Sequence, residues 1–203
     1  MRREAPTAGP RRIDRRALFA SLVPPEPGGG HWLRVQRPAM ACRFEVLLDS
    51  ADAALVPAAR AALDEIDRIE AALSWFRETS ELSRVNREAA RRPVVASPEL
   101  FALLRLCGEV HDLSGGAFDP TSTPLSRAWG FLAREGRLPE PDEIERAGRA
   151  VGWKKVVLDE RERSVRFACD GLELNLGSIG KGWALDRISA GLRAGWASRA
   201  LVS

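Results

Sequence analysis

One long amphipathic segment constrains the fold of this chain more than any other feature. Between Leu55 and Leu73, apolar residues recur at spacings of three and four. This is the period of a helix with one buried face, so the pattern predicts a helix over residues 50–74. Strand patterns precede it at residues 32–36 and 43–48. We therefore expect an α+β fold in which helices and sheets pack together.

Turn and cap signals divide the rest of the chain. Ser97, followed by proline and glutamate, predicts a helix start, and residues 114–116 (SGG) predict its end. Another helix is expected between Pro141 and Gly152. Residues 75–86 interrupt the helical pattern and indicate a structured loop with a short helical turn. Strands are expected at residues 155–158, 164–168, 172–176 and 197–203, with a helix before Gly195 between the last two.

The first 30 residues are expected to form a disordered basic leader and linker. Residues 1–16 contain six arginines against two acids, whereas the whole chain carries only +3. Residues 17–203 therefore carry a net charge of −1, which gives the folded part no electrostatic reason to bind nucleic acid. The apolar run after Arg16 is at the lower limit for an export signal, and residues 24–30 (PPEPGGG) are typical of a linker.

Cysteine, histidine and hydropathy patterns argue against several classes of protein. Cys42, Cys107 and Cys169 are far apart and form no CxxC pair, so neither a disulfide framework nor a zinc site is indicated. Only two histidines occur, too few for a multi-histidine metal site. No run of 18 apolar residues exists, so no transmembrane helix is expected.

The strongest local signal is the segment 177–182 (GSIGKG), which lies between a strand pattern and a helix pattern. Glycines let a ligand approach the backbone closely, a helix start presents unpaired N–H groups, and Lys181 adds a positive charge. This combination suits a phosphate or pyrophosphate. Asn175 and Gly182 stand where a P-loop needs glycine and serine or threonine. A tight turn with a surface lysine remains the alternative.

Three other segments are candidates, each with a structural alternative. Residues 115–121 (GGAFDPT) offer backbone groups and a carboxylate to a ribose or ring N–H, or form a helix cap and an Asp-Pro turn. Residues 80–86 (SELSRVN) favour a capped helical turn. Met40 and the pair Trp75-Phe76 either pack in the interior or form an apolar platform for an aromatic ring system.

Taken in order, four blocks of sequence resemble the ApbE family of FAD:protein FMN transferases. They are residues 39–44 (AMACRF), 80–86 (SELSRVN), 114–121 (SGGAFDPT) and 174–186 (LNLGSIGKGWALD). The resemblance runs from about residue 32 to the end of the chain. It implies an FAD-binding region over residues 31–203, with helices and sheets around a flavin cleft.

The resemblance also implies an activity, namely magnesium-dependent transfer of FMN from FAD to a serine or threonine hydroxyl of a target flavoprotein, with release of AMP. It implies Ser178 as a magnesium ligand, in part through its carbonyl group, and a location at the outer face of the bacterial inner membrane. No catalytic residue is assigned. The residues that match FAD-contacting positions are Met40, Phe76, Ala117, Phe118, Asp119, Asn175 and Lys181.

Two departures from the family pattern leave other functions open. Asn175 stands where the family often has aspartate, and the carboxy-terminal half of the family, with its remaining magnesium ligands, is expected to be missing. The alternatives are a truncated, non-catalytic FAD-binding remnant and an FAD pyrophosphatase that uses water as the nucleophile.

Overall fold

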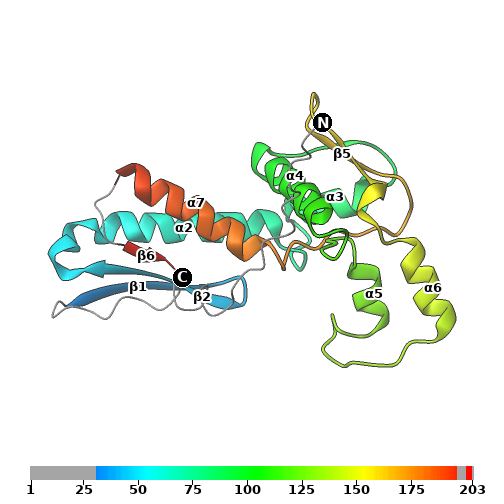
Figure 1. Cartoon of the computed structure of the whole chain (residues 1–203), viewed down its shortest axis with the longest axis horizontal. Coiled ribbons are helices and arrows are strands. Elements are labelled where there is room, and N and C mark those ends of the chain that lie inside the picture. The colour runs from blue at the N-terminus through cyan, green and yellow to red at the C-terminus, as the bar shows by residue number, and fades with distance from the viewer. Residues whose placement is uncertain (1–30, 196–199, 203) are drawn as a thin grey trace, which may run out of the picture.

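The described chain has two structural halves, which lie end to end along the long axis in Figure 1. The computed structural model describes residues 31–195 and 200–202. The expected leader and linker, residues 1–30, lie outside the described residues, as do residues 197–199 and 203 of the expected last strand. Helices and antiparallel sheets make up both halves, which confirms the α+β fold class.

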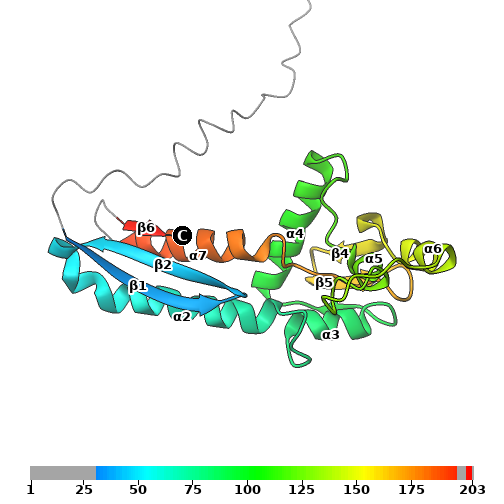
Figure 2. The same cartoon turned by 90° about the horizontal axis from the view of Figure 1, so that it is seen from below.

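The first half is a three-stranded antiparallel sheet with two long helices on one face. The strand order is β1-β2-β6, and α2 and α7 run side by side along the sheet (Figure 2). The strand nearest the C-terminus therefore joins a hairpin formed near the start of the described chain. The elements are β1 (Trp32–Ala39), β2 (Cys42–Asp49), the 3-10 helix η1 (Ser50–Leu55), α2 (Val56–Leu73), α7 (Gly180–Gly195) and β6 (Ala200–Val202).

The predicted apolar stripe of α2 forms the centre of the core. Every second residue of β2 is also buried, beginning at Phe44, as expected for a strand with one covered face. The α2 stripe packs over these side chains, and α7 packs alongside α2. The buried α2 residues are Ala59, Leu63, Ile66, Ile69 and Leu73.

The second half contains the long helix α4 and several shorter helices around a small antiparallel sheet of order β3-β5-β4. The predicted helix start at Ser97 is confirmed, because the Ser97 hydroxyl accepts a hydrogen bond from the N–H of Leu100 at 3.2 Å. The elements are α3 (Glu81–Glu88), β3 (Val94–Val95), α4 (Pro98–Leu113), α5 (Thr123–Ala128), α6 (Pro141–Arg149), η2 (Trp153–Lys155), β4 (Val156–Asp159) and β5 (Ser164–Phe167).

Two sequence predictions are wrong in this half. Residues 172–176 do not form a strand, because their backbone groups pair with a side chain and a loop instead of a neighbouring strand. Residues 75–86 contain more helix than the one predicted turn, because α3 continues to Glu88. The predicted cap at Ser80 is confirmed, since its hydroxyl accepts a hydrogen bond from the N–H of Ser83 at 3.0 Å. The helix α5 and the strand β3 were not foreseen.

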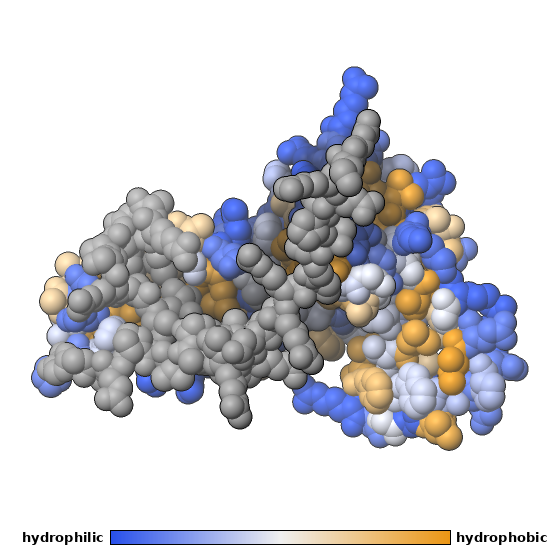
Figure 3. Space-filling model, in the orientation of Figure 1, coloured by the Kyte–Doolittle hydropathy of each residue, from blue (hydrophilic) through white to orange (hydrophobic). Residues whose placement is uncertain are grey.

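Apolar surface is exposed at the end of the molecule formed by α5 and α6. Figure 3 shows hydrophobic side chains over this region, where Phe131 and Leu138 are exposed. Among the described residues, no helix is both long enough and apolar enough to cross a bilayer.

The exposed and the buried cysteine, Cys42 and Cys107, make a test of the core. Cys107 is buried in α4 and burial raises the pKa of its thiol to about 12, whereas Cys42 is exposed. Because the thiolate is the reactive form, we expect iodoacetamide at pH 8 to alkylate Cys42 rapidly and to leave Cys107 unmodified until the protein is unfolded. Peptide mass spectrometry of native and denatured samples measures this. Equal labelling rates in the native sample would contradict the packing of α4.

Candidate functional site

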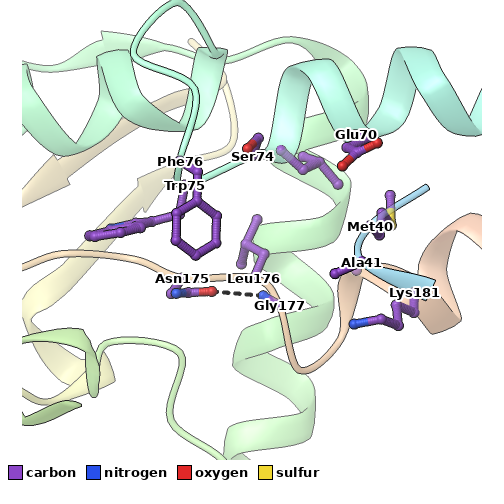
Figure 4. Close-up of a pocket in the computed structure, with 12 residues that line it drawn as sticks. Met40, Ala41, Glu70, Ser74, Trp75, Phe76, Asn175, Leu176, Gly177 and Lys181 are labelled. Carbon is purple, nitrogen blue, oxygen red and sulfur yellow. Dashed lines mark hydrogen bonds between the residues drawn. The ribbon is translucent and has the colours of Figure 1, made fainter. Parts of the chain in front are cut away.

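A hollow of about 230 Å³ lies where the two halves meet (Figure 4). Three stretches that are far apart in the sequence form it: the turn between β1 and β2, the end of α2 with the loop after it, and the turn that leads into α7. It collects four of the predicted FAD-contacting residues, Met40, Phe76, Asn175 and Lys181. The other lining residues are Ala41, Glu70, Leu73, Ser74, Trp75, Leu176, Gly177 and Gly180.

The β1–β2 turn places Met40 at the hollow through an uncommon backbone. Ala39 pairs with Cys42, so the turn has two central residues, and both have positive φ values, 49° for Met40 and 57° for Ala41. Two-residue hairpins favour this geometry, but glycine or asparagine usually occupies it. The strained backbone brings the Met40 side chain to the mouth of the hollow beside the start of α7.

An aromatic wall, Trp75 and Phe76, closes the opposite side. The ring centroids are 5.1 Å apart with an interplanar angle of 90°, an edge-to-face arrangement that aromatic pairs favour. Phe76 is 76% exposed, which is unusual for a large apolar side chain. One ring of the wall is therefore free to stack with a planar ligand.

The start of α7 supplies positive electrostatic potential. The helix begins at Gly180, so Lys181 lies in its first turn, where helix N–H groups lack intrahelical partners. The lysine side chain is exposed, and within the described part of the chain no carboxylate forms an ion pair with it. Figure 4 shows it lying beside the turn at Gly177. This end of the hollow can hold an anionic group.

The path into this turn depends on Asn86 of α3. Its side-chain amide donates to the carbonyl oxygen of Leu174 and its side-chain oxygen accepts from the N–H of Leu174, both at 2.9 Å. The N–H of Asn175 donates to the carbonyl oxygen of Pro120 at 2.9 Å. These bonds satisfy the buried backbone as a strand ladder would. They are the reason why residues 172–176 run extended without joining a sheet.

Asn175 closes the turn itself. Its side-chain oxygen accepts a hydrogen bond from the N–H of Gly177 at 2.9 Å (Figure 4). A Cβ atom on Gly177 would lie 3.1 Å from that oxygen, so a larger residue at this position would crowd the bond. The amide nitrogen of Asn175 remains able to donate to a ligand, which a carboxylate at this position could not do.

Ala117, Phe118 and Asp119 do not line the hollow; they lie in the loop after α4. Asp119 accepts hydrogen bonds from the backbone and hydroxyl of Thr121, at 2.9 and 2.6 Å, and from the N–H of Trp153 at 3.1 Å. These contacts tie the loop to the connection between α6 and β4. Contact between FAD and these three residues stays a prediction.

The sequence did not single out eight of the lining residues as ligand contacts, among them Ala41, Glu70 and Trp75. Glu70 follows Ile69 on the predicted α2 stripe, but the stripe does not show which end of the helix borders a hollow. For Trp75, the only indication in the sequence is its position next to Phe76, with which it forms the possible apolar platform. Ala41 is neither glycine nor asparagine, so its residue type does not predict a turn with positive φ.

Residues 40–203 match the family model of the ApbE family. The chain belongs to the ApbE family.

Relatives and solved ApbE structures match this chain over part of their own length. A FAD:protein FMN transferase from Treponema pallidum is 32% identical over 151 residues, which cover 70% of this chain and 42% of that protein. The ApbE protein from Thermotoga maritima has a TM-score of 0.71 at 28% identity, and the match covers 79% of this chain and 52% of that one. The apo flavinyl transferase ApbE from Pseudomonas stutzeri has a TM-score of 0.76 at 25% identity, covering 85% of this chain and 55% of that one.

The Ser178 position, which the ApbE resemblance links to magnesium, is exposed in the turn before α7. In the part of the chain that the structure describes, no group of three or more His, Cys, Asp or Glu side chains comes together as a metal site requires. Mg²⁺ prefers an octahedral set of oxygen ligands, and a single serine does not provide it. The described residues therefore offer Ser178 as the candidate protein ligand at this turn, and water and the phosphates of a bound ligand would have to supply other positions.

The Asn86 bonds predict a measurable loss of stability. Asn86→Ala leaves the buried N–H and carbonyl groups of Leu174 without partners, at a cost of about 1–3 kcal/mol, so we expect the melting temperature to fall by roughly 3–9 °C. Asn86→Asp keeps the acceptor but turns a carboxylate oxygen toward the carbonyl oxygen of Leu174, so we expect a fall at least as large. Differential scanning calorimetry of both variants tests this. A melting temperature of Asn86→Ala within one degree of the wild type would contradict it.

Proposed function

We propose that this chain is the FAD-binding part of an enzyme that transfers FMN from FAD to a serine or threonine hydroxyl of a target flavoprotein and releases AMP. One observation carries the proposal: the hollow joins an exposed aromatic ring to an unpaired lysine at a helix start. FAD has the complementary parts, a planar ring system and a pyrophosphate. The name of the T. pallidum relative, FAD:protein FMN transferase, supports the same assignment.

The geometry suggests how FAD would lie. The pyrophosphate would meet the first turn of α7, where Lys181 and free N–H groups favour negative charge. The amide nitrogen of Asn175 would donate to an oxygen of the ligand, since its side-chain oxygen is already held by Gly177. Met40 and Phe76 would contact aromatic rings of FAD from either side of the hollow.

The chemistry needs charge stabilisation more than covalent participation of the protein. The acceptor hydroxyl oxygen attacks the phosphorus of the FMN half, the bond from that phosphorus to the bridging oxygen breaks, and AMP leaves with that oxygen. The hydroxyl proton passes to a base. Lys181 would stabilise the charge that develops on the phosphate oxygens. The remaining groups of the site are proposed to lie in the parts of ApbE proteins that this chain does not span.

Magnesium dependence is part of the proposal and rests on the family resemblance. A metal ion would neutralise the phosphate oxygens, with Ser178 as one ligand. Placement at the outer face of the inner membrane is likewise proposed on the resemblance alone.

Hydrolysis of FAD to FMN and AMP is a second candidate, because water can replace the acceptor hydroxyl in the same site. FAD binding without any cleavage is the third outcome. A single incubation separates the three.

Lys181 gives the direct test of the binding site. We expect Lys181→Ala to weaken FAD binding roughly tenfold, because it removes the one full positive charge that the described residues place at the pyrophosphate position. Lys181→Arg should retain most of the affinity. Isothermal titration calorimetry with FAD measures both, with Lys154→Ala as the control, since Lys154 is an exposed lysine in η2, in the other half. Unchanged affinity in folded Lys181→Ala would overturn the proposed site.

The activity is tested by incubating the full-length gene product that contains this chain with FAD, Mg²⁺ and a target flavoprotein. We expect flavin fluorescence to stay with the target after denaturing electrophoresis and AMP to appear by chromatography. EDTA and an acceptor-site alanine variant of the target should each abolish the label. Free FMN together with AMP, with an unlabelled target, would indicate the pyrophosphatase. FAD retained without AMP would indicate a non-catalytic binding protein.

A further inference from the structure

A three-residue network links α5, in the second half of the molecule, to the aromatic wall of the hollow. Arg127 of α5 forms two hydrogen bonds to the carboxylate of Glu173, at 2.7 and 2.6 Å. The same carboxylate accepts a hydrogen bond from the indole N–H of Trp75 at 3.3 Å. The Arg127 guanidinium carbon also lies 5.7 Å from the centroid of the Trp75 ring, which is within the range of a cation–π contact.

We propose that Arg127 is a positioning residue that holds Trp75 in place through Glu173, and that Trp75 in turn sets the orientation of Phe76. The inference rests on the proposed function, because it assigns Phe76 to the FAD ring system. Trp75 lines the hollow, whereas Arg127 and Glu173 do not. Arg127 therefore acts on the ligand only through other side chains.

The geometry of the ion pair is suited to this task. A guanidinium bound by two parallel hydrogen bonds is fixed in direction as well as in distance. The Glu173 side chain is only 23% exposed, so solvent competes weakly for it. The hydrogen bonds that Arg127 donates to Glu173 are the main cause that raises the pKa of Arg127 above its ordinary value.

Trp75 has space into which it can move when it is released. It lies between the candidate site and a second hollow of about 640 Å³, which Glu173, Asn86 and Arg87 also border. Without the hydrogen bond to its indole N–H, the ring is free to turn toward that space. Phe76 would then lose its edge-to-face partner, and the wall would no longer present a fixed ring to the ligand.

The chain offers a matched control for the ion pair. Arg137 and Glu143 also form a bidentate pair, at 2.8 and 3.1 Å, in the α5–α6 part of the molecule. Neither residue lines the candidate site. Arg137→Met therefore removes an arginine–glutamate pair of the same geometry without disturbing the wall.

FAD affinity and near-ultraviolet circular dichroism of the whole chain test the inference. We expect Arg127→Met to raise the dissociation constant of FAD roughly three- to tenfold, with Glu173→Gln similar and Arg127→Lys smaller, while Arg137→Met leaves it unchanged. In a Trp75→Phe background, adding Arg127→Met should produce no further change, since the link is already broken. Without ligand, Arg127→Met should remove the circular dichroism band that Trp75→Phe also removes.

Each outcome decides between the two proposals. If the wild-type chain binds no FAD, the proposed function fails, and the ligand-free circular dichroism still tests the network. If FAD binds and Arg127→Met equals Arg137→Met in affinity and spectrum, the positioning role is overturned and the proposed function stands. An undiminished effect of Arg127→Met in the Trp75→Phe background also overturns it. Should Arg127→Met not fold, Glu173→Gln, which keeps the side-chain shape, carries the same comparison.

Discussion

The pairing of Asn86 with both backbone groups of Leu174 is the contact on which the site depends. It holds an extended segment that has no strand beside it. This segment leads directly into the glycine turn and then into α7, so its position determines where Lys181 and the free end of the helix lie. A buried backbone without such partners would be costly. One amide side chain from α3 therefore aligns the two halves at the point where they meet.

The hollow itself exists because three separate turns converge on it. The β1–β2 turn contributes Met40 from a positive-φ backbone, the end of α2 leads into the aromatic wall, and the start of α7 brings the lysine. Strain in such a turn persists only when surrounding structure holds it, and here the antiparallel pairing of β1 with β2 on one side and the packing of α2 on the sheet do so. The site is a property of the assembled fold and of no single segment.

Apolar and charged groups divide the hollow into two ends with different chemistry. The aromatic wall is exposed and held by a network that reaches α5, whereas the opposite end is formed by backbone and one ammonium group. Such a division suits a ligand with a planar ring at one end and phosphates at the other. The match covers 42% of the length of the T. pallidum relative, and 52% and 55% of the solved ApbE structures from T. maritima and P. stutzeri.

Local sequence was sufficient for features that depend on near neighbours. The α2 stripe, the Ser97 cap and the lysine at the start of α7 were all predictable, because helix period and capping involve residues within a few positions of each other. The order of the four family blocks was sufficient to indicate the ApbE family. Tertiary structure alone decided that residues 172–176 are not a strand, since their partner Asn86 is 88 residues away. It likewise decided that Asp119 binds Thr121 and Trp153, and that Arg127 reaches Trp75 through Glu173, because hydrogen bonds between distant segments leave no periodic pattern in the chain.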